Sequence, residues 1–137
     1  PVGIVIQKTG TAGWIAGLIS SATESVPFEW QPKVLLALIY FITIFLTEIS
    51  SNAATAIIMT PISIAVAQQM GFDPRAFVFA VAFAASASFI TPVGYQTNLM
   101  VYGPGGYKFS DYIRVGFPLA FIFWIMAIFI LPILWPI

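Results

Sequence analysis

Cysteine and histidine are both absent from this 137-residue sequence, and charge is scarce, with five basic and five acidic residues. Without cysteine and histidine there can be no disulfide, no thiolate or imidazole metal site, and no nucleophile–base pair built on either residue. The formal net charge of zero provides no basic patch for nucleic acid. The sequence therefore predicts neither an enzyme nor a nucleic-acid-binding protein.

Apolar residues dominate what is present. Hydrophobic residues make up 60% of the sequence, charged residues only 7%, and the mean hydropathy is +0.98. Soluble domains carry about 25% charged residues, so this chain cannot cover a surface that faces water. We predict an all-α integral membrane protein, embedded in the lipid bilayer of the inner or plasma membrane. The sequence begins at Pro1 without a signal peptide, and we expect it to be a piece of a longer polypeptide.

The first half of the chain divides into two segments. Residues 1–33 contain an apolar helix, either amphipathic or spanning, followed by a polar connector. In residues 34–72, two apolar arms flank a cluster of small polar side chains between Thr47 and Thr55. Each arm is slightly short for a span, which needs about 20 apolar residues, and the turn between them carries no charge. This pattern favours a re-entrant helical hairpin with its tip near 50–53 over two complete spans.

The second half contains a discontinuous helix and a final span. Residues 73–106 are too long for one helix within a hydrocarbon core of about 30 Å, and Pro92 and Gly94 favour a break. We predict a transmembrane helix over 75–90, a break near 91–98 and a short helix to about Tyr102. Residues 107–137 form a loop and a last transmembrane helix. The excess of Lys108 and Arg114 over Asp111 favours a cytoplasmic loop.

Two polar breaks inside apolar segments are typical of ion-coupled transporters. Unwound backbone at membrane depth is tolerated where it lines a cavity. There, hydroxyl and carbonyl oxygens bind an alkali cation, and exposed helix N-termini face an anion. The first break offers Thr47, Ser50, Ser51 and Asn52, and the second offers Thr91, Gly94, Gln96, Thr97 and Asn98. A simple capping turn and a simple proline kink are the respective structural alternatives.

Three further polar residues have open roles. Glu48 could carry protons, complete a cation site, or serve as a buried structural carboxylate, and the structural role is favoured because no basic residue lies in its segment. Ser86 and Ser88 lie among alanines and are typical of a small-residue packing face.

The combination of Thr47-Glu48-Ile49-Ser50-Ser51-Asn52-Ala53 with Pro92-Val93-Gly94-Tyr95-Gln96-Thr97-Asn98 resembles the second repeat of the divalent anion:sodium symporters. This family belongs to the ion transporter superfamily, within the citrate-transporter-like group. The resemblance implies a sodium site of Thr47, Ser50, Asn52 and the Gly94 carbonyl. It implies an anion site of Ser51, Asn52, Gly94, Thr97 and Asn98.

The resemblance also implies an architecture and a function. The family's complete transporter has two inverted repeats, works as a homodimer and moves its substrate by an elevator mechanism. This chain would be the second, C-terminal half and would require the N-terminal repeat of the same polypeptide. It would take part in secondary active transport of a small divalent anion, with sodium as the coupling ion and no other cofactor.

Two departures from the family pattern bear on the substrate. Ala53 replaces the threonine of the usual Ser-Asn-Thr tip, and Gly94-Tyr95-Gln96-Thr97 replaces the Ala-Thr-Pro-Pro of dicarboxylate carriers. Both favour sulfate over a dicarboxylate. The alternatives are a proton-coupled anion or metalloid carrier, with Glu48 as its titrating group, and an accessory membrane subunit that transports nothing.

Overall fold

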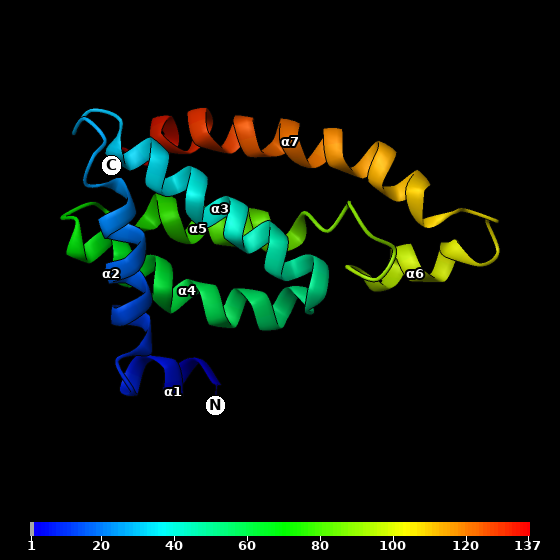
Figure 1. Cartoon of the computed structure of the whole chain (residues 1–137), viewed down its shortest axis with the longest axis horizontal. Helices are drawn as coiled ribbons and strands as arrows, with labels where there is room; N and C mark the ends of the chain where they lie inside the picture. Colours follow the sequence, from blue (N-terminus) through cyan, green and yellow to red (C-terminus); the bar gives the residue numbers. More distant parts are fainter. Residues whose placement is uncertain (1) are drawn as a thin grey trace.

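The computed structural model describes residues 2–137, and every regular element in this range is an α-helix (Figure 1). The prediction of an all-α protein is therefore confirmed. The helices are α1 (Val2–Lys8), α2 (Thr11–Thr23), α3 (Gln31–Ile49), α4 (Asn52–Gln69), α5 (Pro74–Ser86), α6 (Gln96–Tyr102) and α7 (Phe109–Leu134).

The N-terminal segment forms two helices where the sequence predicted one. Helices α1 and α2 meet at an angle of 71°, because Gly10 between them adopts a left-handed conformation with φ of 73° that only glycine adopts at low cost. Pro1, the first residue of the predicted 1–33 segment, lies outside the described residues. By length and composition, α1 and α2 together could form one bent span.

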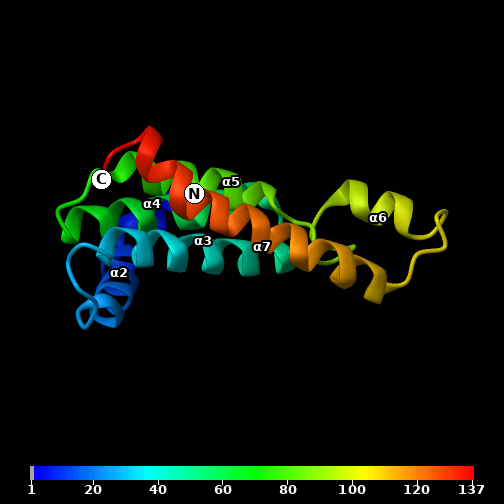
Figure 2. The ribbon, with the colours of Figure 1, turned by 90° about the horizontal axis from the view of Figure 1, so that it is seen from above.

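Helices α3 and α4 form an antiparallel hairpin. Ser50 leaves the helical region with φ of −117° and ψ of 168°, and the Ser51 hydroxyl caps α4 by accepting a hydrogen bond from the Ala54 amide at 3.2 Å. The turn at Ser50 and Ser51 lies within the predicted 50–53 range. Both views place it part-way along α7 and beside the unwound segment that follows α5 (Figures 1 and 2).

The predicted boundaries of the discontinuous helix are wrong by several residues. Helix α5 ends at Ser86 rather than near residue 90, and α6 already begins at Gln96, so the break covers 87–95 rather than 91–98. The helix ends early because the Ile90 and Thr91 amides donate to the Glu48 carboxylate, not to carbonyls of α5. Pro92 also disfavours a helical conformation at Thr91.

The core lies where α5 packs against α3 and α4, with α7 along the outside of α3 and α5 (Figures 1 and 2). Small residues such as Ala80 and Ala84 let α5 approach its neighbours closely, and the large Phe77 side chain is fully buried in the same core. The Trp124 indole nitrogen donates to the Ala37 carbonyl at 2.9 Å and ties α7 to α3.

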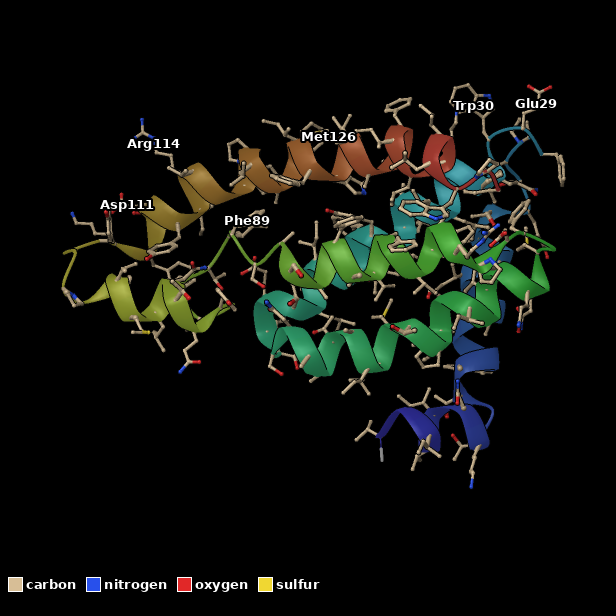
Figure 3. All side chains as sticks on the ribbon, turned by 180° about the vertical axis from the view of Figure 1, so that it is seen from behind. Glu29, Trp30, Phe89, Asp111, Arg114 and Met126 are labelled. Atoms are coloured by element: carbon tan, nitrogen blue, oxygen red, sulfur yellow. The ribbon has the colours of Figure 1, made fainter. Side chains whose placement is uncertain are left out.

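Within residues 2–137, three helices are long and apolar enough to cross a membrane by length and composition, namely α3, α4 and α7. Most large side chains of α7 are exposed and apolar, including Phe117, Phe121 and Phe129, as expected where a helix meets lipid. The chain is an integral membrane protein. Figure 3 shows that Asp111 and Arg114 lie near one end of α7, whereas Glu29 and Trp30 lie beside its opposite end.

Candidate ion and anion site

The structure brings the two predicted breaks together. The end of α3 and the start of α4 contact the unwound segment 87–95 through hydrogen bonds. The side chains of Glu48 and Asn52 accept from this segment, and the Thr47 hydroxyl bonds to that of Ser88. The two breaks are far apart in sequence, and a common location is what a shared binding site requires.

Four oxygen atoms form a compact cluster at this junction. The Thr47 hydroxyl lies 2.8 Å from the Asn52 side-chain oxygen and 2.8 Å from the Ala85 carbonyl. The Ser88 hydroxyl lies 3.2 Å from that of Thr47 and donates to the Asn52 oxygen at 2.7 Å. Thr47 and Ser88 are buried, and Asn52 is half-buried.

The cluster has fewer protons than close contacts. Each hydroxyl carries one proton, so Thr47 and Ser88 can supply two of the four contacts and leave two without a proton. A small cation would compensate for the oxygen–oxygen repulsion in the other two. Turning the Asn52 amide by 180° would instead direct its NH₂ group at both hydroxyls. Without an ion, the Asn52 side chain can therefore donate hydrogen bonds to both hydroxyls. With a cation present, its side-chain oxygen can coordinate that cation.

The other hairpin residues predicted for the site lie at its edge. Ser50 is half-buried and Ser51 is exposed. Neither hydroxyl belongs to the oxygen cluster, and that of Ser51 accepts the hydrogen bond that caps α4. The structure therefore brings Thr47 and Asn52 together and leaves Ser50 and Ser51 facing outward from them.

Glu48 binds the backbone of the unwound segment. One carboxylate oxygen accepts from the Ile90 amide at 2.9 Å, and the other accepts from the Thr91 amide at 2.9 Å and the Thr91 hydroxyl at 2.7 Å. The Thr91 hydroxyl in turn accepts from the Gly94 amide at 3.0 Å. These contacts agree with the structural role favoured for Glu48, because they satisfy amides that a broken helix leaves without partners.

Gly94 occupies a position that has no room for a side chain. A Cβ atom there would lie 2.5 Å from a Glu48 carboxylate oxygen and 3.2 Å from the Ser88 Cβ. Its carbonyl oxygen accepts no hydrogen bond from any residue in the range 2–137. Gly94 therefore lies beside both Glu48 and Ser88, with its amide bound to the Thr91 hydroxyl and its carbonyl oxygen without a donor.

Asn98 and Thr97 play different parts at the start of α6. The side-chain nitrogen of Asn98 donates to the Ser88 carbonyl at 2.8 Å and to the Thr91 carbonyl at 3.3 Å, so it joins two points of the unwound segment. Thr97 and Gln96 are exposed. Of the anion ligands predicted in the second break, Asn98 is engaged in the fold and Thr97 is free to meet a ligand.

Sequence reasoning missed two parts of the cluster, the Ser88 hydroxyl and the Ala85 carbonyl. Ser88 was interpreted as part of a packing face, yet it is 3% exposed and bonded to the hairpin tip. Its position shortly before Pro92 was the available signal, since a proline break frees the preceding polar groups from a helix. The buried Thr55 hydroxyl also has no partner among the described residues, and Thr55 shares a helix face with Asn52.

The donor set narrows the choice of ion. Within residues 2–137, no three His, Cys, Asp or Glu side chains are grouped so that they could hold a metal ion. The donors at the junction are hydroxyl, amide and carbonyl oxygens, which suit an alkali cation in transporters.

The sequence is similar to those of known membrane transporters. The family described as the sodium:sulfate symporter transmembrane region matches residues 3–137. An uncharacterized transporter of Synechocystis is 48% identical over 122 residues, which are 89% of this chain and 19% of that protein. Sodium/sulfate cotransporter 1 of Chlamydomonas reinhardtii is 34% identical over 127 residues, covering 93% of this chain and 14% of the relative.

A third relative has a different named substrate. The sodium-dependent dicarboxylate transporter of Staphylococcus saprophyticus is 31% identical over 112 residues, which are 82% of this chain and 21% of that protein. The chain thus spans about a fifth or less of the length of these three relatives.

Proposed function

Since this chain belongs to the sodium:sulfate symporter transmembrane family, we propose that it is part of a secondary transporter that moves a small divalent anion together with sodium. The observation that carries this proposal is the meeting of two helix breaks around the oxygens of Thr47, Asn52 and Ser88. Transporters use such unwound segments to bind alkali cations and anions at the same place.

The proposed sodium site consists of Thr47, Ser50, Asn52 and the Gly94 carbonyl. Thr47 and Asn52 already lie within hydrogen-bonding distance of each other, and the free Gly94 carbonyl would complete the shell from the opposite side. Ser50 would contribute after a small movement of the exposed turn. The negative charge of Glu48, close to Gly94, would help to hold the cation.

The proposed anion site consists of Ser51, Asn52, Gly94, Thr97 and Asn98, at the outer side of the same junction. The α4 N-terminus points its first amides there, and helix N-termini attract anions. The five basic residues are Lys8, Lys33, Arg75, Lys108 and Arg114, and none lies in either break. Sodium bound next to the anion would therefore offset its charge.

Sulfate is the preferred substrate in this proposal. Ala53 lacks the hydroxyl that the resembling family offers to a carboxylate, and it is exposed at the start of α4. The relatives named for a substrate include a sodium/sulfate cotransporter and a dicarboxylate transporter. The four oxygens of a tetrahedral oxyanion span a shorter distance than the two carboxylates of a dicarboxylate, so its binding groups can all lie at one place.

The complete transporter would contain an N-terminal repeat of inverted topology and would act as a homodimer in the plasma membrane. The hairpin tip lies part-way along α7 (Figure 1), which supports a re-entrant hairpin whose tip is at membrane depth. An elevator movement would carry the hairpin and the unwound segment together, since hydrogen bonds join them.

The test is uptake of labelled sulfate and labelled succinate by the full-length protein in proteoliposomes, with sodium or choline outside. Sulfate uptake that requires sodium supports the proposal. Uptake driven by a proton gradient without sodium would support a proton-coupled carrier instead. No flux of either anion would favour the accessory-subunit alternative.

A further inference from the structure

We propose that Glu48 is a positioning residue, which fixes the unwound segment 87–95 against the hairpin and thereby sets the place of the Gly94 backbone relative to Thr47 and Asn52. This inference rests on the proposed sodium-coupled transport and adds a residue to it. Glu48 itself would not touch the ion.

The Glu48 carboxylate makes three hydrogen bonds, all to donors in the unwound segment. Two come from backbone amides, of Ile90 and Thr91, and one comes from the Thr91 hydroxyl. Hydrogen bonds to an ionised acceptor are about twice as strong as neutral ones. One side chain therefore anchors two consecutive peptide groups of the unwound segment.

The anchoring extends to Gly94 by contact. The Thr91 hydroxyl, held by Glu48, accepts the Gly94 amide. The Gly94 Cα also faces a Glu48 carboxylate oxygen so closely that an added Cβ would lie 2.5 Å from it. Gly94 is thus fixed from two directions by the same carboxylate.

The covalent position of Glu48 links this anchor to the oxygen cluster. Glu48 directly follows Thr47 in the last turn of α3. The residue that carries the carboxylate is therefore covalently linked to the residue whose hydroxyl bonds to Asn52 and Ala85. A shift of the unwound segment would change the distance between the Gly94 carbonyl and this cluster. The carboxylate opposes such a shift.

The charge of Glu48 has no basic partner. The ion pair between Arg75 and Asp73 is the only salt bridge within residues 2–137, and Glu48 is 8% exposed. A buried carboxylate is tolerated when hydrogen bonds satisfy it, and here they come from the segment that it positions. Removing the carboxylate would leave two half-buried amides, of Ile90 and Thr91, without their acceptors.

The experiment uses the full-length transporter in proteoliposomes and compares wild type, Glu48→Gln, Thr91→Val and the control Glu29→Gln. Glu29 is an exposed carboxylate at the opposite end of the molecule (Figure 3). We expect the half-saturating sodium concentration to rise about tenfold in Glu48→Gln and severalfold in Thr91→Val. The Glu29→Gln control should leave both the half-saturating sodium concentration and the anion KM within about twofold of wild type.

A second measurement reports position without transport. Spin labels attached at Ala53→Cys and Tyr95→Cys, both exposed, give the distance distribution between the hairpin tip and the unwound segment. In a background without other cysteines, Glu48→Gln should broaden this distribution, and Glu29→Gln should leave it unchanged. This readout also decides the case if Glu48→Gln is too impaired for flux measurements.

The outcomes separate the two proposals. Wild type that shows no sodium-dependent uptake refutes the proposed function, whatever the variants do. Wild type that requires sodium, combined with an unchanged sodium dependence and an unchanged distance distribution in Glu48→Gln, overturns the positioning role alone.

Discussion

Gly116 of α7 packs so closely against the unwound segment that a Cβ atom at this position would overlap the carbonyl oxygen of Phe89. The same atom would lie 2.9 Å from the Ile90 Cα, and the Ile90 amide donates to Glu48. Figure 3 shows Phe89 where the segment between α5 and α6 rises toward α7. The last helix thus holds the break from the side opposite the hairpin.

Gly116→Ala should therefore destabilise the protein. The added methyl group meets backbone, which cannot rotate away as a side chain can, and overpacking of this kind costs about 1–3 kcal/mol. The thermal unfolding temperature of the full-length protein in detergent measures the effect. Gly17→Ala is a matched control, because Gly17 is also helical and has nothing within 4 Å of an added Cβ. An equal loss in both variants would contradict the close contact.

Ser88→Ala should raise the sodium concentration at which sulfate uptake is half-maximal, whereas Ser86→Ala should not. The Ser88 hydroxyl contacts both Thr47 and Asn52 in the oxygen cluster, while the exposed Ser86 hydroxyl bonds only the Ala82 carbonyl of its own helix. Loss of one buried hydrogen-bond partner costs about 1–3 kcal/mol, which corresponds to roughly a five- to 150-fold change in binding. Sodium titration of sulfate uptake measures it. Equal titrations for the two variants would remove Ser88 from the site.

The sequence was sufficient to predict the helical class and the last helix. Apolar content alone predicted a membrane protein, and the last transmembrane helix expected within residues 107–137 is α7, at whose start the Asp111 carboxylate accepts the Lys108 amide at 2.7 Å. The end of α5 could not be predicted. It depends on the Glu48 carboxylate, which competes with α5 for the Ile90 and Thr91 amides from a distant part of the sequence.

The polar residues of the site could be predicted by type, but their contacts could not. Thr47 and Asn52 were predicted to belong to one site, and the Thr47 hydroxyl does lie 2.8 Å from the Asn52 side-chain oxygen. The bond from Ser88 to Asn52 depends on how α5 packs between α3 and α4, and local sequence patterns do not specify such packing. The sodium- and anion-ligand roles of all the predicted site residues remain predictions, for Thr47, Ser50, Ser51, Asn52, Gly94, Thr97 and Asn98 alike.

Thr97→Val and Asn98→Ala should separate ligand binding from folding. Thr97 is exposed, so its loss should raise the sulfate KM and leave the unfolding temperature unchanged. Asn98 bridges the Ser88 and Thr91 carbonyls, so Asn98→Ala should lower both stability, by about 1–3 kcal/mol, and transport. Uptake kinetics and thermal unfolding of the same preparations test both statements. Unchanged stability in Asn98→Ala would show that the bridge is dispensable.

The protein should become less stable in acid because the Asp73 carboxylate, at the start of α5, loses its charge there. Asp73 caps this helix by accepting the Arg75 amide at 2.9 Å and forms an ion pair with the Arg75 side chain at 2.7 Å. The side-chain hydrogen bond from Arg75, followed by the backbone hydrogen bond, lowers the pKa of Asp73 below its ordinary value. A carboxyl whose pKa is lower in the folded state stabilises that state above the ordinary pKa, and the contribution is lost as the pH falls through the folded-state pKa.

Asp73→Ala should thus lower the unfolding temperature at about pH 7, and the difference from wild type should shrink well below about pH 4, where the wild-type carboxyl is also protonated. Asp73→Asn retains an oxygen that can cap the helix. At neutral pH its unfolding temperature should lie between those of wild type and Asp73→Ala. Melting curves of all three proteins across this range provide the measurement. A difference between wild type and Asp73→Ala that stays constant with pH would show that the ion pair adds nothing to the cap.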